Sequence, residues 1–180
     1  MLAVLRLGHR VERDKRLTSH VALVARAFGA DKMYYTGDKD QNVELTVMKV
    51  CKRWGGSFET EYIGSWRKLL EAWKGSVVHL TMYGLPLKSV IYEIRRVHAE
   101  NKKLLVVVGG EKVEPEVYHL ADYNVSVTNQ PHSEAAALAV FLDWLFQGAE
   151  LERTFPDAEI HIVPSAKGKI VQRRSRLIQT

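Results

Sequence analysis

The chain has 180 residues, 46% hydrophobic and 26% charged, with 26 basic residues, 21 acidic residues and a net charge of +5. This balance predicts one compact domain with a short appendage and excludes a disordered or fibrous chain. A single cysteine, Cys51, excludes an internal disulfide and a multi-cysteine zinc site, so we expect no metal. No apolar run reaches the ~20 residues that a membrane-spanning helix needs, so we expect a cytoplasmic protein with no membrane partner.

Short runs rich in β-branched residues alternate with helical segments along the chain. We expect strands at residues 3–7, 32–36, 57–63, 76–82, 103–108 and 124–128. We expect helices at residues 18–28, 42–54, 66–73, 87–100, 116–120 and 133–146. The run 104–108 is apolar without alternation, which is typical of a central parallel strand covered on both faces. The order predicts an α/β fold, a mostly parallel sheet with helices on both faces.

Helical periodicity stops near residue 152. We therefore expect a domain over residues 1–152 and a basic extension over residues 153–180, with a β-hairpin that pairs 159–163 with 169–172. The helix at 133–146 has almost no polar face, so it must be covered on more than one side. Other parts of the chain or a second subunit could supply that cover, and we favour a homodimer.

Basic residues gather in two regions. After Glu159 there is no acidic residue, and the tail carries Lys167, Lys169, Arg173, Arg174 and Arg176. A second cluster near the N-terminus consists of Arg6, Arg10, Arg13, Lys15 and Arg16. These regions predict a phosphate-binding surface. The alternative is an ordinary solvated tail and charged loop.

Three loops follow expected strands at one edge of the sheet, where open parallel sheets bind ligands. They span residues 81–86, 109–113 and 129–134, and their glycines and the start of the last helix suit a nucleotide-like ligand. The chain has no G-x-G-x-x-G after the first strand and no G-x-x-x-x-G-K-[ST], which argues against ordinary dinucleotide and triphosphate sites. No H-E-x-x-H or G-x-S-x-G pattern supports a hydrolase, and Cys51 is interpreted as a packing residue.

The order of these segments resembles the SPOUT methyltransferases. Residues 20–29 resemble the first SPOUT motif, with His20 in place of its asparagine and Arg26 six residues later. Residues 106–111 resemble the second motif, and residues 125–137 resemble the third without its usual serine-leucine-asparagine triplet. Within this superfamily, segments 6–10, 26–30, 110–113 and 129–134 are similar to the archaeal tRNA (cytidine-56) 2′-O-methyltransferases.

The resemblance implies a deep C-terminal trefoil knot, a homodimer and transfer of a methyl group from S-adenosylmethionine to the ribose of cytidine 56 in tRNA. The cofactor contacts that it implies are Leu80, Thr81, Met82, Gly84, Gly109, Gly110, Glu111, Lys112, Val113, Val127, Thr128, Asn129, Gln130, Pro131, His132, Ser133 and Glu134. Arg26 is the expected catalytic residue. The pKa of an arginine, above ~12, is too high for a general base, so we expect this side chain to orient the 2′-hydroxyl while water or a phosphate takes the proton.

The expected RNA contacts are Arg10, Arg13, Arg16, Lys167, Lys169, Arg173 and Arg174. Two other functions stay open. One is an RNA-binding protein that keeps the SPOUT frame without catalysis, and the other is a SPOUT enzyme that methylates a base. The Gly109-Gly110 turn and Arg26 favour the ribose methyltransferase over both.

Overall fold

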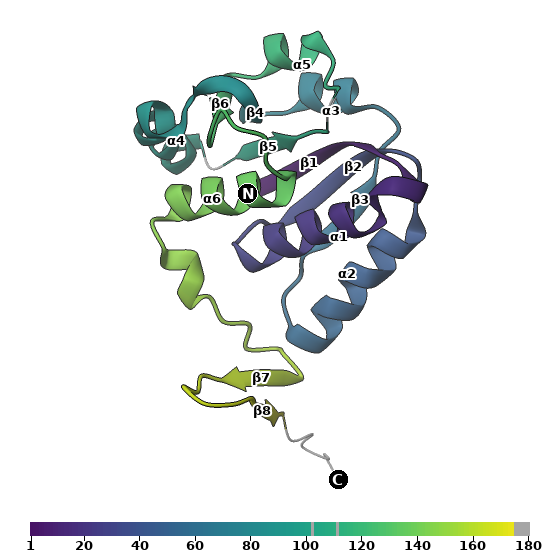
Figure 1. The fold of residues 1–180 in the computed structure, drawn as a ribbon, viewed down its shortest axis with the longest axis vertical. Coiled ribbons are helices and arrows are strands. Elements are labelled where there is room, and N and C mark those ends of the chain that lie inside the picture. The colour runs from purple at the N-terminus through teal and green to yellow at the C-terminus, as the bar shows by residue number, and fades with distance from the viewer. Residues whose placement is uncertain (102, 111, 175–180) are drawn as a thin grey trace.

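A computed structural model describes residues 1–101, 103–110 and 112–174 of the chain. Glu111 and Arg176, both named above, lie outside the described residues, as does the side chain of Lys15. Figure 1 shows a central sheet with helices on both faces and a small hairpin below it. The expected α/β architecture is confirmed.

The main sheet has six strands in the order β3-β2-β1-β5-β4-β6, and every neighbouring pair is parallel. The strands are β1 (Leu2–His9), β2 (Lys32–Gly37), β3 (Glu59–Tyr62), β4 (Ser76–Pro86), β5 (Leu104–Val108) and β6 (Tyr123–Ser126). Because all six run the same way, their carboxyl ends meet at one edge of the sheet. We call this the carboxyl edge.

The helices form two layers. They are α1 (Val11–Ala27), α2 (Gln41–Trp54), α3 (Trp66–Ala72), α4 (Leu87–Asn101), α5 (Pro115–Leu120) and α6 (Glu134–Phe146), followed by a 3-10 helix, η1 (Ala149–Glu152). One core joins α1, α2, α4 and α6 to the sheet, and a smaller core on the other face joins α3 and α5 (Figure 1). In β5, Val106 faces the first core and Val107 the second, which explains its unbroken apolar run.

Helix α1 starts earlier than the sequence predicts. Its first residue is Val11, so the expected start at residue 18 is wrong. The Asp38 carboxylate accepts a hydrogen bond from the Val11 amide at 3.0 Å, which satisfies a free donor at the helix start. The hydroxyl of Thr18, the first residue of the expected helix, instead lies 2.8 Å from His9 Nδ1.

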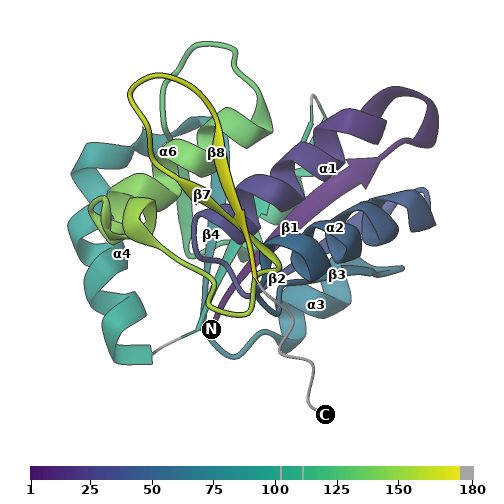
Figure 2. The ribbon, with the colours of Figure 1, turned by 90° about the horizontal axis from the view of Figure 1, so that it is seen from below.

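The extension ends in an antiparallel hairpin of β7 (Ile160–Val163) and β8 (Ile170–Arg173), as expected. In Figure 2 this hairpin lies in front of α1 and α6. Asp157 fastens the extension to the end of α2, because its carboxylate accepts from the Gly56 amide at 3.0 Å. The division near residue 152 and the trefoil knot stay predictions.

No helix within the described ranges is both long and apolar enough to cross a lipid bilayer.

Candidate functional site

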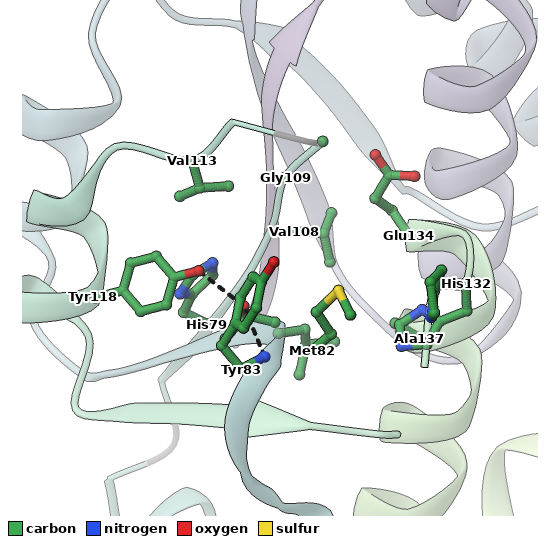
Figure 3. Close-up of a pocket in the computed structure, with 14 residues that line it drawn as sticks. His79, Met82, Tyr83, Val108, Gly109, Val113, Tyr118, His132, Glu134 and Ala137 are labelled. Atoms are coloured by element: carbon green, nitrogen blue, oxygen red, sulfur yellow. Dashed lines mark hydrogen bonds between the residues drawn. The ribbon is translucent and has the colours of Figure 1, made fainter. Parts of the chain in front are cut away.

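A pocket of about 500 Å³ lies at the carboxyl ends of β4 and β5, beside the start of α6. We call it the edge pocket. Its lining residues are His79, Leu80, Thr81, Met82, Tyr83, Val108, Gly109, Gly110, Val113, Tyr118, Pro131, His132, Glu134 and Ala137. Figure 3 shows Val113 and Tyr118 on one side of this space and Glu134 and Ala137 on the other. The volume is within the range of pockets that hold small ligands and cofactors.

The edge pocket brings together nine of the residues expected to contact a cofactor. These are Leu80, Thr81, Met82, Gly109, Gly110, Val113, Pro131, His132 and Glu134. The other described candidates are not in its lining; they are Gly84, Lys112, Val127, Thr128, Asn129, Gln130 and Ser133. Gly84 has a packing role, because a Cβ there would lie 2.5 Å from the Asn124 backbone.

Two of the remaining candidates shape the loops around the edge pocket. Asn129 Nδ2 donates to the Met82 carbonyl oxygen at 2.5 Å, which ties the loop after β6 to the end of β4. Ser133 is the N-cap of α6, with its hydroxyl accepting from the Ala136 amide at 3.2 Å. These contacts support the backbone that carries the lining residues.

His79 and Tyr118 line the pocket although no motif in the sequence indicates them, whereas Tyr83 belongs to the expected loop 81–86. Tyr118 Oη lies 3.0 Å from Thr81 Oγ1, and Asn124 Nδ2 donates to the Tyr118 carbonyl oxygen. Asn124 Oδ1 is therefore left to accept from His79 Nδ1, 2.9 Å away. Burial lowers the pKa of His79, which keeps the ring neutral near pH 7. A histidine flanked by Val78 and Leu80 in an apolar strand is the one signal that could have found it.

Glu134 gives the edge pocket its negative charge. It lies in the first turn of α6, and its carboxylate faces the pocket (Figure 3). Leu80, Val108 and Ala137 supply apolar wall. The site therefore suits a ligand with a flat apolar part and a cationic part.

A second cavity of about 720 Å³ adjoins the edge pocket, and Gly110 and Val113 belong to both linings. We call it the basic cleft, because in its wall three cations, Arg10, Arg13 and Lys112, outnumber the carboxylates of Asp38 and Glu114. It runs along the ends of β1 and β2 and the segment after β3. The Arg10 side chain is 48% exposed and donates to the Asp14 carboxylate at 3.0 Å. This hydrogen bond lowers the pKa of Asp14, which stays charged.

The other expected RNA contacts are distributed unevenly. Arg16 is exposed on α1 but does not line the basic cleft. Lys167, Lys169, Arg173 and Arg174 are exposed on the hairpin, which lies beyond the end of α2 in Figure 1. The sequence places Arg6 in the N-terminal basic cluster at the surface, and this is wrong. Its side chain is 1% exposed and cannot contact a phosphate at the surface.

The structure does not bring Arg26 to either cavity. Its side chain is near the C-terminal end of α1, on the order of 20 Å along the helix from Val11. The guanidinium is buried, donates to the carbonyl oxygens of Trp54 and Gly55 at 3.0 and 2.5 Å, and lies 4.3 Å from the ring centre of Phe155. Within its own chain Arg26 thus joins α1, α2 and the extension.

The described part of the chain also contains no group of three His, Cys, Asp or Glu side chains arranged to hold a metal ion.

Solved structures with this fold include RNA-modifying enzymes of the SpoU type. The SpoU methyltransferase AviRb from Streptomyces viridochromogenes aligns with a TM-score of 0.60 and 14% identity, over 85% of this chain and 61% of that one. The A. aeolicus TrmH/SpoU tRNA modifying enzyme aligns with a TM-score of 0.54 and 16% identity, over 84% of this chain and 76% of that one. The chain thus has the fold of the SpoU class of methyltransferases.

The model of the family described as tRNA ribose 2′-O-methyltransferase, aTrm56, matches residues 54–172. A Thermococcus kodakarensis protein named tRNA (cytidine(56)-2′-O)-methyltransferase is 57% identical over 173 residues, which cover 95% of this chain and 96% of that protein. A Methanocaldococcus jannaschii protein of the same name is 56% identical and covers 98% of both chains. The chain belongs to this family, and the resemblance seen in the sequence is confirmed.

We predict that Arg26→Ala lowers the free energy of unfolding by about 2–4 kcal/mol, because two hydrogen bonds to a charged donor are lost in a buried place. Denaturant unfolding measures this loss, with the exposed Arg96→Ala as the control. Stability within about 0.5 kcal/mol of the parent, together with a hundredfold loss of methyl transfer, would instead support the catalytic role expected from the sequence.

Proposed function

We propose that this chain transfers the methyl group of S-adenosylmethionine to the 2′-hydroxyl of cytidine 56 in tRNA. Family membership and the names of the relatives support this reaction. The observation that carries it is the junction of the edge pocket with the basic cleft at Gly110 and Val113. A cationic cofactor and an anionic RNA can meet there with their reacting atoms in contact. Since tRNA is the substrate, we also infer a cytoplasmic location.

The edge pocket fits S-adenosylmethionine in size and chemistry. AviRb has also been crystallised in complex with this cofactor, which supports the same cofactor here. Leu80, Val108 and Ala137 would pack on the adenine, and the loop backbone around Gly109 would approach it closely. Glu134 would attract the positive charge that the sulfonium and amino groups carry. When bound, the cofactor supplies a methyl group on a sulfonium, ready for attack by an oxygen.

The basic cleft would hold the nucleotide that is modified. Arg10, Arg13 and Lys112 can bind the flanking phosphates and so position the ribose at the junction. Methyl transfer requires the 2′-oxygen in line with the carbon–sulfur bond at about 3–3.5 Å, and this positioning is the main contribution of the protein. The 2′-hydroxyl proton leaves to water or a phosphate.

Methyl transfer to an unmodified archaeal tRNA transcript, followed by nucleoside mass spectrometry, tests the proposal. We expect 2′-O-methylcytidine in the fragment that contains position 56, and none when cytidine 56 is replaced by another nucleotide. A methyl group on a base would identify a base methyltransferase, whereas binding of tRNA without any methyl transfer would identify a non-catalytic RNA-binding protein. Either result rejects the proposal.

We predict that Gly110→Trp abolishes cofactor binding. A Cβ at Gly110 meets no atom closer than Glu134 Oε1 at 3.7 Å, so the indole has room to enter the edge pocket and occupy it. Calorimetry with S-adenosylmethionine measures the affinity, which we expect to fall about a hundredfold or more. Gly64→Trp is the matched control, because that glycine also has open space but lies outside the edge pocket. Normal binding to a folded Gly110→Trp protein would place the cofactor elsewhere.

We predict that the hairpin binds tRNA through phosphates. Replacing Lys167, Lys169, Arg173 and Arg174 with glutamine should weaken tRNA binding and reduce the slope of log affinity against log salt by about one unit for each phosphate that is no longer bound. Cofactor affinity and the nucleotide modified should not change. An unchanged salt slope would remove the hairpin from the RNA surface. Lys49→Gln and Lys52→Gln on α2 provide a control for charge alone.

We predict a homodimer. Helix α6 is apolar nearly all round, and although five of its thirteen residues are buried, Val140 and Trp144 are each 40% exposed. The hairpin exposes Ile162, Ile170 and Val171, which are 57%, 48% and 50% accessible. Such apolar surface is typical of a subunit contact. Sedimentation at micromolar concentration should give a dimer, and Trp144→Asp should shift it toward monomer; a monomeric parent protein contradicts the proposal.

A further inference from the structure

Arg6 is the largest fully buried side chain among the described residues. It lies near the end of β1 and between the starts of two helices. Its Nη2 atom is 3.5 Å from Glu134 Oε1, at the start of α6, and 3.7 Å from Asp14 Oδ2, at the start of α1. Nη1 donates to the Leu7 carbonyl oxygen, and Nε has no hydrogen-bond partner among the described residues.

The two carboxylates that share Arg6 are associated with different cavities. Glu134 lines the edge pocket, and no second cation is paired with it among the residues that the structure describes. Asp14 lines neither cavity, but it also holds Arg10, which lies in the wall of the basic cleft. A continuous chain of charges therefore runs from one cavity to the other through Glu134, Arg6, Asp14 and Arg10.

Because Glu134 and Asp14 share Arg6, a change in the charge at one cavity affects the other cavity. A cation in the edge pocket competes with Arg6 for Glu134, so Arg6 interacts more strongly with Asp14. Asp14 then holds Arg10 less strongly, and Arg10 becomes more available to an RNA phosphate. Because the Arg6 side chain is almost completely shielded from water, its electrostatic interactions are stronger than they would be at the surface.

We propose that Arg6 is a positioning residue that couples the two cavities, so that a cationic cofactor in the edge pocket strengthens tRNA binding in the basic cleft. This inference rests on the proposed function, which assigns the cofactor and the tRNA to these cavities. It predicts a difference between substrate and product. S-adenosylhomocysteine lacks the sulfonium charge and should strengthen tRNA binding less than a charged cofactor does.

The experiment measures the affinity for an unmodified tRNA transcript alone, with S-adenosylhomocysteine, and with sinefungin, an unreactive analogue that carries an amine near the sulfonium position. In the parent protein we expect sinefungin to tighten tRNA binding about fivefold or more, and more than S-adenosylhomocysteine does. Linkage requires tRNA to tighten sinefungin binding by the same factor, which provides an internal check.

Three variants locate the coupling. Asp14→Asn should abolish the effect of sinefungin on tRNA binding, and sinefungin is used at saturating concentration so that a change in its own affinity does not enter the comparison. Arg6→Gln should also abolish it. Because Arg6→Gln leaves Glu134 without its cation while Asp14 keeps Arg10, the charge-balanced pair Arg6→Gln with Glu134→Gln is measured as well, and unfolding curves confirm that each protein is folded. Arg96→Gln, exposed on α4, is the control and should keep the full effect.

A parent protein that binds both ligands without any mutual effect overturns the inference and leaves the proposed function intact. So does a coupling that persists in Asp14→Asn. A parent protein that binds neither sinefungin nor S-adenosylhomocysteine overturns the proposed function itself. A purely structural role for Arg6 would lower stability in the variants without changing the ratio of tRNA affinities with and without sinefungin.

Discussion

The parallel direction of all six strands is the constraint on which the site depends. It places every strand end at the carboxyl edge, and it makes α1 and α6 begin there after β1 and β6. Segments as distant in the chain as 7–13, 79–83, 108–110 and 131–137 therefore meet at two adjoining cavities. Helices cover both faces of this sheet, as is typical of parallel sheets.

The two arginines show what local sequence cannot predict. Arg26 lies opposite the apolar stripe of its helix, so periodicity favours an exposed position, but the extension returns and covers it with Phe155. The sequence groups Arg6 with surface cations, yet the starts of α1 and α6 enclose it. In both cases the burial comes from segments far along the chain, and no spacing pattern records such contacts.

Much of the fold is predictable because it depends on local pattern. The unbroken apolar run of β5, the approximate positions of the six strands and the presence of the hairpin follow from periodicity and turn residues. The loops at the pocket are predictable from the ends of strands, and nine of the residues that the family resemblance indicates line the edge pocket. The positions of His79 and Tyr118 in the edge pocket could not be predicted from the sequence, because their contact through Asn124 depends on how α5 packs on β4. The start of α1 could not be predicted either, because Asp38, on another loop, accepts the hydrogen bond from the Val11 amide at the start of the helix.

Cofactor binding at the carboxyl edge, between β4, β5 and α6, underlies both the proposed reaction and the coupling through Arg6. Hydrogen–deuterium exchange with and without S-adenosylhomocysteine tests this position most directly, because it reports protection along the whole backbone. We expect protection concentrated in segments 79–84, 108–113 and 130–137. A groove of about 720 Å³ between α2 and β3 is the main alternative cavity. Protection at residues 41–61, with the three edge segments unchanged, would contradict cofactor binding at the carboxyl edge.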